Sequence, residues 1–172
     1  MADAGLNFSL MVMSPAFKSC YIRHEYTIVK FMTATIRSFN SQDTANVISL
    51  WRACDLTRPW NDPNKDIQRK LKVADNLFLV AESGAQIVGS VMGGYDGHRG
   101  WINYLAVDPS HRKLGLGRSL MLEVEKRLLE QGCPKINLQV RATNTAVIDF
   151  YESIGFSDDE VRSFGKRLVP DN

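Results

Sequence analysis

A turn that contains two glycines is the clearest candidate for chemistry in the sequence. It follows a hydrophobic run, precedes a long helical pattern, and consists of Arg112, Lys113, Leu114, Gly115, Leu116 and Gly117, with Arg118 next. Such a turn gathers unpaired backbone N–H groups at the positive end of a helix dipole, where phosphate groups bind. The same spacing is equally typical of a tight turn that simply enters a helix. The turn alone therefore leaves both interpretations open.

Two common phosphate motifs do not fit this turn. It does not end in Gly-Lys-Ser or Gly-Lys-Thr, which argues against a nucleoside triphosphate site of the Walker type. Leu120 stands where the dinucleotide fingerprint has its third Gly or Ala, and the turn is not the first strand-to-helix turn of a doubly wound sheet. A dinucleotide enzyme remains a weaker alternative, which protection of the protein against heat by NAD would favour.

The pattern of hydrophobic residues predicts one mixed α/β domain around this turn. Asn40 or Ser41 can cap a first helix with an apolar stripe at Val47, Ile48, Trp51 and Cys54. Helices are also expected at 66–72, 115–132 and 144–153, and strands at 35–38, 77–81, 86–92, 101–107, 136–140 and 161–168. The strands 77–81 and 86–92 should form an antiparallel hairpin, and the four glycines in 93–100 predict a loop.

Length and composition limit the classes of protein to consider. The chain has 172 residues, 44% hydrophobic and 23% charged, which is typical of a single globular domain. Its net charge of +2 is small and its basic residues are scattered, so no nucleic-acid partner is expected. No run is long enough to cross a bilayer, and the three cysteines favour a reducing compartment, so we expect a cytoplasmic protein without a membrane partner.

Two segments together resemble the GNAT family, the Gcn5-related N-acetyltransferases. Residues 112–117 match its motif Gln/Arg-x-x-Gly-x-Gly/Ala, and residues 144–156 match its second segment with Asn144, Tyr151 and Gly155 in place. The resemblance covers about residues 33–168 and implies the GNAT acyl-CoA N-acyltransferase fold, a mostly antiparallel central sheet with helices on both faces. It leaves residues 1–32 as a leader of uncertain role and 33–172 as the domain.

The resemblance implies acetyl-CoA as co-substrate and an amine as acceptor, with no metal. The turn with Arg118 would bind the cofactor, and the strand around Leu105, Ala106 and Val107 would splay from its neighbour and pair with the pantetheine arm. The amide of Val107 would then face the thioester carbonyl. Asn144 would cap its helix, bond to the arm, or do both. Tyr151 corresponds to the family's general acid, although a core tyrosine would look the same in sequence.

The acceptor side is less defined by the sequence. An aromatic residue and a carboxylate suit an amine, so Trp60, Asn61 and Asp62 are candidates to border its pocket, although Trp60 can also pack under its own loop. Asp96 and His98 lie in a loop that could overhang the site. Residues 101–104, Trp-Ile-Asn-Tyr, hold no carboxylate to act as general base, which leaves direct base catalysis or a water chain open.

Several properties stay open at this level. The acceptor can be a small molecule, a peptide N-terminus or a lysine, and the edge strands are compatible with a homodimer. The missing carboxylate also favours a different class, a non-catalytic acyl-CoA-binding or regulatory domain with the same fold.

Overall fold

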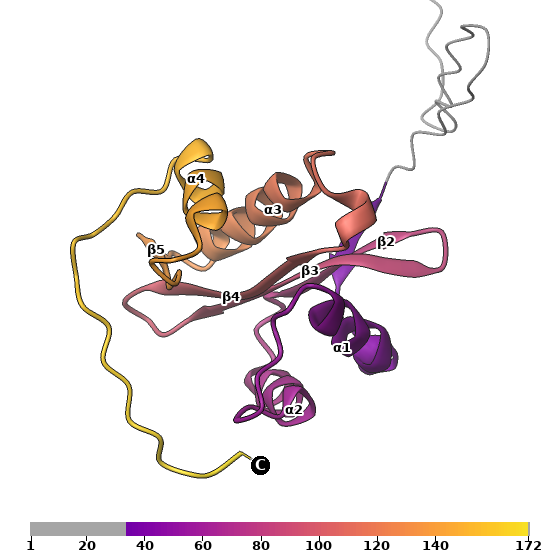
Figure 1. Cartoon of the computed structure of the whole chain (residues 1–172), viewed down its shortest axis with the longest axis horizontal. Helices are drawn as coiled ribbons and strands as arrows, with labels where there is room; N and C mark the ends of the chain where they lie inside the picture. The colour runs from indigo at the N-terminus through magenta and orange to yellow at the C-terminus, as the bar shows by residue number, and fades with distance from the viewer. Residues whose placement is uncertain (1–33, 172) are drawn as a thin grey trace, which may run out of the picture. The chain divides into compact units, whose positions relative to one another are not determined.

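The computed structural model describes residues 34–171, so the leader predicted for 1–32 lies outside the described residues. One five-stranded sheet organises this region, with the strands in chain order (Figure 1). The first four strands are antiparallel neighbours and the last pair is parallel. The strands are β1 (Thr35–Ser38), β2 (Phe78–Ser83), β3 (Gln86–Tyr95), β4 (Gly100–Val107) and β5 (Ile136–Leu138).

Helices cover both faces of the sheet, as predicted. Figure 1 shows α1 (Thr44–Ala53) and α2 (Pro63–Val73) on one face, and α3 (Leu116–Glu130) and α4 (Thr145–Ser153) on the other. Short 3-10 turns precede α1 (Ser41–Asp43) and follow β4 (Pro109–His111). Among the described residues, no helix is long and apolar enough to span a membrane.

Alternating side chains of β2 explain why the sheet has two cores. Phe78 and Val80 pack with Trp51 of α1, whereas Leu79 and Ala81 pack with the residues of α3. Each face of a strand thus buries its own hydrophobic set, because successive side chains point to opposite sides. The sheet is therefore covered on both faces.

Local signals set the helix starts. Asn40 accepts a hydrogen bond from the amide of Gln42 and forms a capping box with Asp43, as expected for a capping residue before the first helix. Asp62 caps α2 and Pro63 occupies its first turn, so this helix begins three residues before the predicted Asp66. The prediction placed the start of this helix too late, because Pro63 marks the first turn of the helix.

The loop predicted for 93–100 was also too long. β3 continues to Tyr95 and β4 begins at Gly100, so only four residues form the turn. Gly93 lies within the strand because α3 packs closely there. A Cβ at this position would be 2.7 Å from Cγ2 of Val124, closer than side-chain atoms approach. This glycine serves helix-to-sheet packing instead of a loop.

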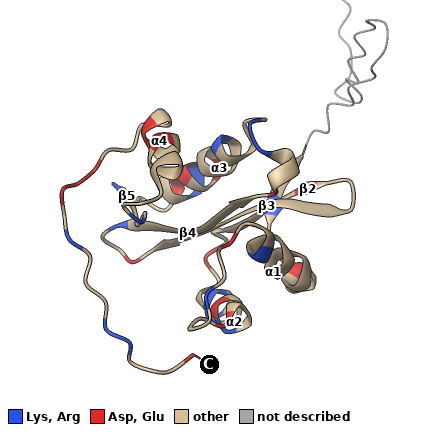
Figure 2. Ribbon diagram, viewed as in Figure 1, with Lys and Arg blue, Asp and Glu red and all other residues tan. Residues whose placement is uncertain are grey.

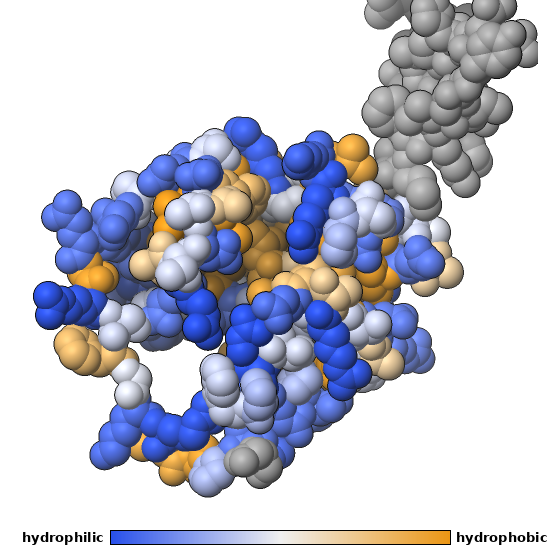
Figure 3. Space-filling model, in the orientation of Figure 1, coloured by the Kyte–Doolittle hydropathy of each residue, from blue (hydrophilic) through white to orange (hydrophobic). Residues whose placement is uncertain are grey.

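The predicted strand at 161–168 was wrong. The segment after α4 forms no helix or strand in the described chain and is largely exposed, with Phe164 at 91%. Its contacts to the β5 side are made by side chains, since Lys135 pairs with Asp159 at 2.6 Å and Gln139 donates to Ser163 at 2.6 Å. Figure 3 shows open space between this segment and the body of the domain. Val161, Phe164 and Leu168 do not alternate as they would in a half-buried strand, and no backbone ladder gives them a face to bury.

Candidate functional site

The two glycines of the turn open helix α3. Lys113 and Gly115 have left-handed backbones, with φ of 62° and 79°, and Gly115 stands at the N-cap without a side-chain hydrogen bond. The first amides of α3 are therefore left without a capping side chain, and the turn curves them toward one place. Substitution of Gly115 would strain this backbone, because a Cβ disfavours positive φ.

Positive charge surrounds these amides. Figure 2 shows Lys and Arg on the connection between β4 and α3. Within residues 34–171, Arg112, Lys113 and Arg118 form no ion pair within 4.0 Å. Arg112 donates through Nε to the carbonyl oxygen of Val107 at 3.1 Å, which ties the turn to the end of β4. Uncapped amides with unpaired cations fit a diphosphate.

The segment after β5 meets this turn through α4. A Cβ at Gly117 would be 3.4 Å from the Phe150 ring, so the two sequence motifs lie against each other. Tyr151, the next residue, is 9% exposed. Its ring lies edge-on to those of Phe150 and Phe156, with ring centroids 5.1 and 5.5 Å apart. Burial raises the pKa of its hydroxyl to about 12, so the phenol keeps its proton at physiological pH.

Asn144 occupies the N-cap position of α4, as expected, but its side chain makes no capping hydrogen bond. Its carbonyl oxygen accepts from the amides of Val147 and Ile148, while the exposed side-chain amide stays outside the helix. The backbone alone begins this helix. The carboxamide is therefore available to another partner.

β4 and β5 separate after three residue pairs. Their parallel register joins Gly100, Trp101 and Ile102 to β5, and no pair follows along the rest of β4. On its other edge β4 continues to pair with β3 as far as Val107. The β4 backbone from residue 103 onward therefore has one edge without a strand partner, beside the turn that begins α3.

A bulge in β4 lies at this point. The β3 register changes between Ser90 and Met92, which face Ala106 and Asn103, so Tyr104 and Leu105 together oppose one residue of β3. Tyr104 has a φ of 51°, and its carbonyl oxygen accepts from the buried Ser90 hydroxyl at 3.2 Å. The indole of Trp51 donates to the same hydroxyl at 2.9 Å and stacks on the Tyr104 ring at 3.9 Å.

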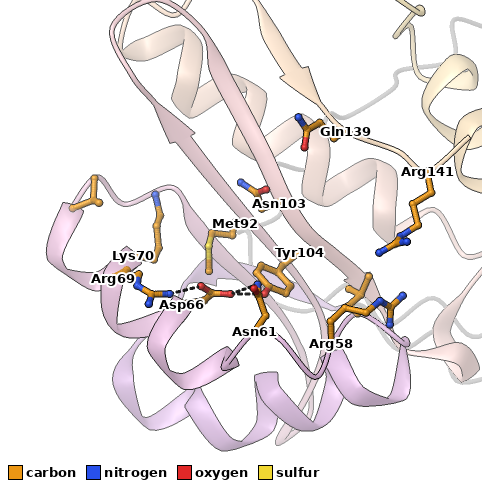
Figure 4. A pocket seen from close by; sticks show the side chains of 12 residues that line it. Arg58, Asn61, Asp66, Arg69, Lys70, Met92, Asn103, Tyr104, Gln139 and Arg141 are labelled. Atoms are coloured by element: carbon orange, nitrogen blue, oxygen red, sulfur yellow. Dashed lines mark hydrogen bonds and ion pairs between the residues drawn. The ribbon is translucent and has the colours of Figure 1, made fainter. Parts of the chain in front are cut away.

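A pocket of about 680 Å³ opens on the α2 side of the bulge. Figure 4 shows the Tyr104 hydroxyl within it, directed at a carboxylate from α2. Asp66 accepts from this hydroxyl at 2.6 Å, from Asn61 at 3.1 Å and from Arg69 at 3.0 Å. Burial and the Asp66 hydrogen bond raise the pKa of Tyr104 to about 12. The lining residues are Leu56, Arg58, Asn61, Asp66, Arg69, Lys70, Val73, Met92, Asn103, Tyr104, Gln139 and Arg141.

The predicted acceptor residues divide in the structure. Asn61 lines the pocket, whereas Trp60 is 52% exposed and Asp62 caps α2. Asp96 and His98 lie outside the pocket lining. Hydrogen bonds from the amides of Arg99 and His98 and from the Trp101 indole lower the pKa of Asp96 to about 2. The Asp96 carboxylate therefore stabilises the turn between β3 and β4.

The other pocket residues carried little signal in the sequence. Asp66 was visible only as the start of a short helix, and its contact with Tyr104 spans 38 residues of the chain. Residues 101–104 hold no carboxylate, and the one that lies against Tyr104 belongs to α2. Neither Arg58 nor Arg141 belongs to a sequence motif that would mark it as a binding residue. In residues 34–171, no cluster of His, Cys, Asp or Glu is arranged to hold a metal ion.

Known proteins are similar to this chain in sequence and in fold. Residues 45–156 match the family described as the Acetyltransferase (GNAT) family. An acetyltransferase of Sodalis glossinidius is 53% identical over 137 residues, which are 79% of this chain and 96% of that protein.

Solved structures extend the likeness in fold. An aminoglycoside acetyltransferase from an uncultured soil metagenomic sample aligns with a TM-score of 0.64 and 23% identity over 80% of this chain and 97% of its own. A glucosamine-6-phosphate N-acetyltransferase from Arabidopsis thaliana aligns with a TM-score of 0.60 and 22% identity over 80% and 99%. Members of the matched family use acetyl-CoA as co-substrate and act on amines. The chain belongs to the GNAT family of N-acetyltransferases.

Proposed function

We propose that the protein transfers the acetyl group of acetyl-CoA to a primary amine by direct attack of the amine while both substrates are bound. The observation that carries this proposal is the open edge of β4, which begins where β5 ends and runs toward the uncapped end of α3. One ligand can follow that edge from the turn at 112–117 to the bulge at Tyr104. The pocket on the other side of the bulge receives the second.

The turn holds the diphosphate of the co-substrate. The amides that open α3 donate to its oxygens, and Arg112, Lys113 and Arg118 supply charge around them. Acetyl-CoA supplies a thioester, whose carbonyl carbon is the electrophile. The unpaired edge at Leu105, Ala106 and Val107 hydrogen-bonds to the extended arm like an added strand, with Asn144 on its other side.

The backbone at Val107 is held in place for this role. Its carbonyl oxygen accepts from the Cys54 thiol at 3.3 Å and from Arg112 at 3.1 Å. These bonds restrain the backbone of Val107, so its own N–H, in the preceding peptide group, can be directed at an oxygen where negative charge develops, and such preorganised donors stabilise the transition state. We assign this position to the amide of Val107.

Tyr151 acts as the general acid. Its buried phenol is protonated throughout the physiological range and can donate to a departing thiolate. The contact between Phe150 and Gly117 supports this assignment, because it joins the helix of Tyr151 to the turn that begins α3.

Tyr104 and Asp66 orient the attacking amine. The Tyr104 hydroxyl donates a hydrogen bond to Asp66, so its lone pairs remain available to an amine N–H. The negative charge of Asp66 also favours the approach of an ammonium group into the pocket. The proton that the amine loses passes to Asp66 or, through water, to solvent.

The acceptor class is a small molecule, a peptide N-terminus or a lysine. The two structural neighbours bear on this only weakly, because their names give an aminoglycoside and an amino sugar phosphate as acceptors and both are below 25% identity. The pocket volume is within the range of small-molecule sites, which are about 300–1,000 Å³.

The test is release of free thiol from acetyl-CoA by the full chain, with a panel of amines and peptides. The proposal predicts release that depends on an acceptor and forms one acetylated amine for each thiol. Tight CoA binding without thiol release for any acceptor would support the alternative, an acyl-CoA-binding domain without turnover.

A further inference from the structure

The pocket beside Tyr104 carries more positive than negative charge. Its lining includes Arg58, Arg69, Lys70 and Arg141, against the single carboxylate of Asp66. We infer that the acceptor is a small molecule that carries an anionic group, a phosphate or a carboxylate, a few bonds from its amine. The inference rests on the proposed function and names the substrate class of that site.

Two of the four cations are neutralised by the protein. Arg69 pairs with Asp66 at 3.0 Å and with the buried Asp171 of the C-terminal segment. Lys70 pairs with Asp75 at 2.5 Å and also donates to the carbonyl oxygen of Gly93. These two side chains form a fixed wall of the pocket.

Arg58 and Arg141 retain charge for a ligand. Within the described chain, Arg141 forms no ion pair within 4.0 Å. The Arg58 partner, Asp55, lies at 3.0 Å, but its carboxylate is 92% exposed, so water screens the pair. Guanidinium groups suit carboxylate and phosphate because their planar N–H groups can donate in parallel.

The two charges of such an acceptor would lie at different ends. In the view of Figure 4, Arg58 and Arg141 are drawn on one side of Tyr104, while Arg69 and Lys70 are drawn on the other. An anion at Arg58 and Arg141 would leave the amine facing Tyr104 and Asp66. A polycationic amine would meet the same two arginines without compensation, since like charges repel.

The experiment measures binding to the full chain saturated with CoA, so that it does not depend on turnover. Calorimetry compares 2-aminoethyl phosphate and β-alanine with ethanolamine and 1,3-diaminopropane, which present a similar amine without the anion. We expect the acidic amines to bind about tenfold tighter or more, because each charged hydrogen bond contributes strongly. The phosphate and carboxylate probes distinguish the two sources of negative charge.

Three variants locate the effect. Arg141→Gln and Arg58→Gln should each weaken binding of the acidic amine by about tenfold to a hundredfold and leave ethanolamine nearly unchanged. Arg52→Gln is the matched control, since Arg52 is exposed on α1 and outside the pocket lining. Equal binding of all four probes, tighter binding of the diamine, or no binding of any probe would overturn the inference.

The outcome also separates this inference from the proposed function. Preference for acidic amines without thiol release would leave the anion site standing and contradict acetyl transfer to these amines. Acetylation of neutral amines, with no preference for acidic ones, would support acetyl transfer and contradict the anion site.

Discussion

Tyr104 joins the two sides of the site. Its left-handed backbone forms the bulge of β4, its ring stacks on Trp51, and its hydroxyl lies against Asp66. A residue with a side chain adopts positive φ at a cost of about 1–2 kcal/mol, and buried hydrogen bonds offset that cost here. The strain is located where the amine and the thioester are proposed to meet.

Tyr151→Phe tests the general acid. Loss of the hydroxyl should lower kcat by about a hundredfold or more, while the Kd for CoA stays within about twofold, since the ring that packs against Phe150 remains. Because the pKa of the phenol is about 12, wild-type kcat should not fall between pH 8 and about pH 10 through loss of this proton. Tyr95→Phe is the control, and an unchanged kcat in Tyr151→Phe would refute the assignment.

Tyr104→Phe tests the orientation of the amine. We expect kcat/KM for the acceptor to fall about tenfold or more, because the partly buried carboxylate of Asp66 loses one donor and the amine loses one acceptor. CoA affinity should be retained. Equal loss of CoA affinity and acceptor turnover would indicate a collapsed bulge instead of a role toward the amine.

At the scale of elements, the bulge depends on two neighbours that touch neither substrate in our account. Trp51 of α1 donates to Ser90 of β3, and Ser90 donates to the backbone of β4. Helix, strand and bulge are thus joined through one hydroxyl with no exposed surface. Contacts on the α1 face of the sheet therefore hold the bulge that lies beside the open edge of β4.

Ser90→Ala should weaken this arrangement. The Trp51 indole would lose its acceptor in a dry core, so we expect the free energy of unfolding to fall by about 1–3 kcal/mol in denaturant titrations, with reduced acetyl transfer. Ser49→Ala, an exposed serine on α1, is the matched control. A Ser90→Ala protein as stable and active as wild type would contradict the role of this hydrogen-bond chain.

The entry to α1 has a pH-dependent contribution to stability. Arg37 donates to both oxygens of the buried Asp43 at 2.7 and 2.9 Å and lowers the pKa of that carboxyl. A lowered pKa means that the stabilisation is complete above the unfolded value of about 3.9 and is lost as the pH falls toward the folded value.

Asp43→Asn should therefore reduce the free energy of unfolding by about 1–3 kcal/mol above pH 5, and the difference should shrink below about pH 4. Unfolding followed between pH 3 and pH 7 measures it. Asp149→Asn, an exposed change on α4, should show no such dependence. A difference that grows on acidification would contradict the sign of the pKa shift.

At the scale of the molecule, sequence patterns predicted what depends on local chemistry. The turn at 112–117, the cap at Asn40 and the alternation in the hairpin could be predicted because each depends on neighbours in the chain. The family resemblance then fixed the order of elements and the fold. The strand predicted at 161–168 did not form, because its few apolar residues do not alternate and no described strand pairs with it.

The pocket was less accessible to prediction. Asp66, Tyr104 and Arg141 lie on three separate segments, and only the bulge and the separation of β4 from β5 bring them to one cavity. Nothing in these residue types or in their spacing along the chain indicates that they line the same pocket. Residues 101–104 hold no carboxylate, and the sequence did not indicate that Asp66, 38 residues away in the chain, would lie against Tyr104.

The central claim is that one ligand follows β4 from the turn to the bulge. A crystal structure of the full chain with CoA tests it most directly. Our account predicts the diphosphate on the amides that begin α3, the arm along the open edge at residues 105–107, and the sulfur within hydrogen-bond reach of the Tyr151 hydroxyl. A diphosphate bound elsewhere, or an arm that leaves the β4 edge, would contradict it.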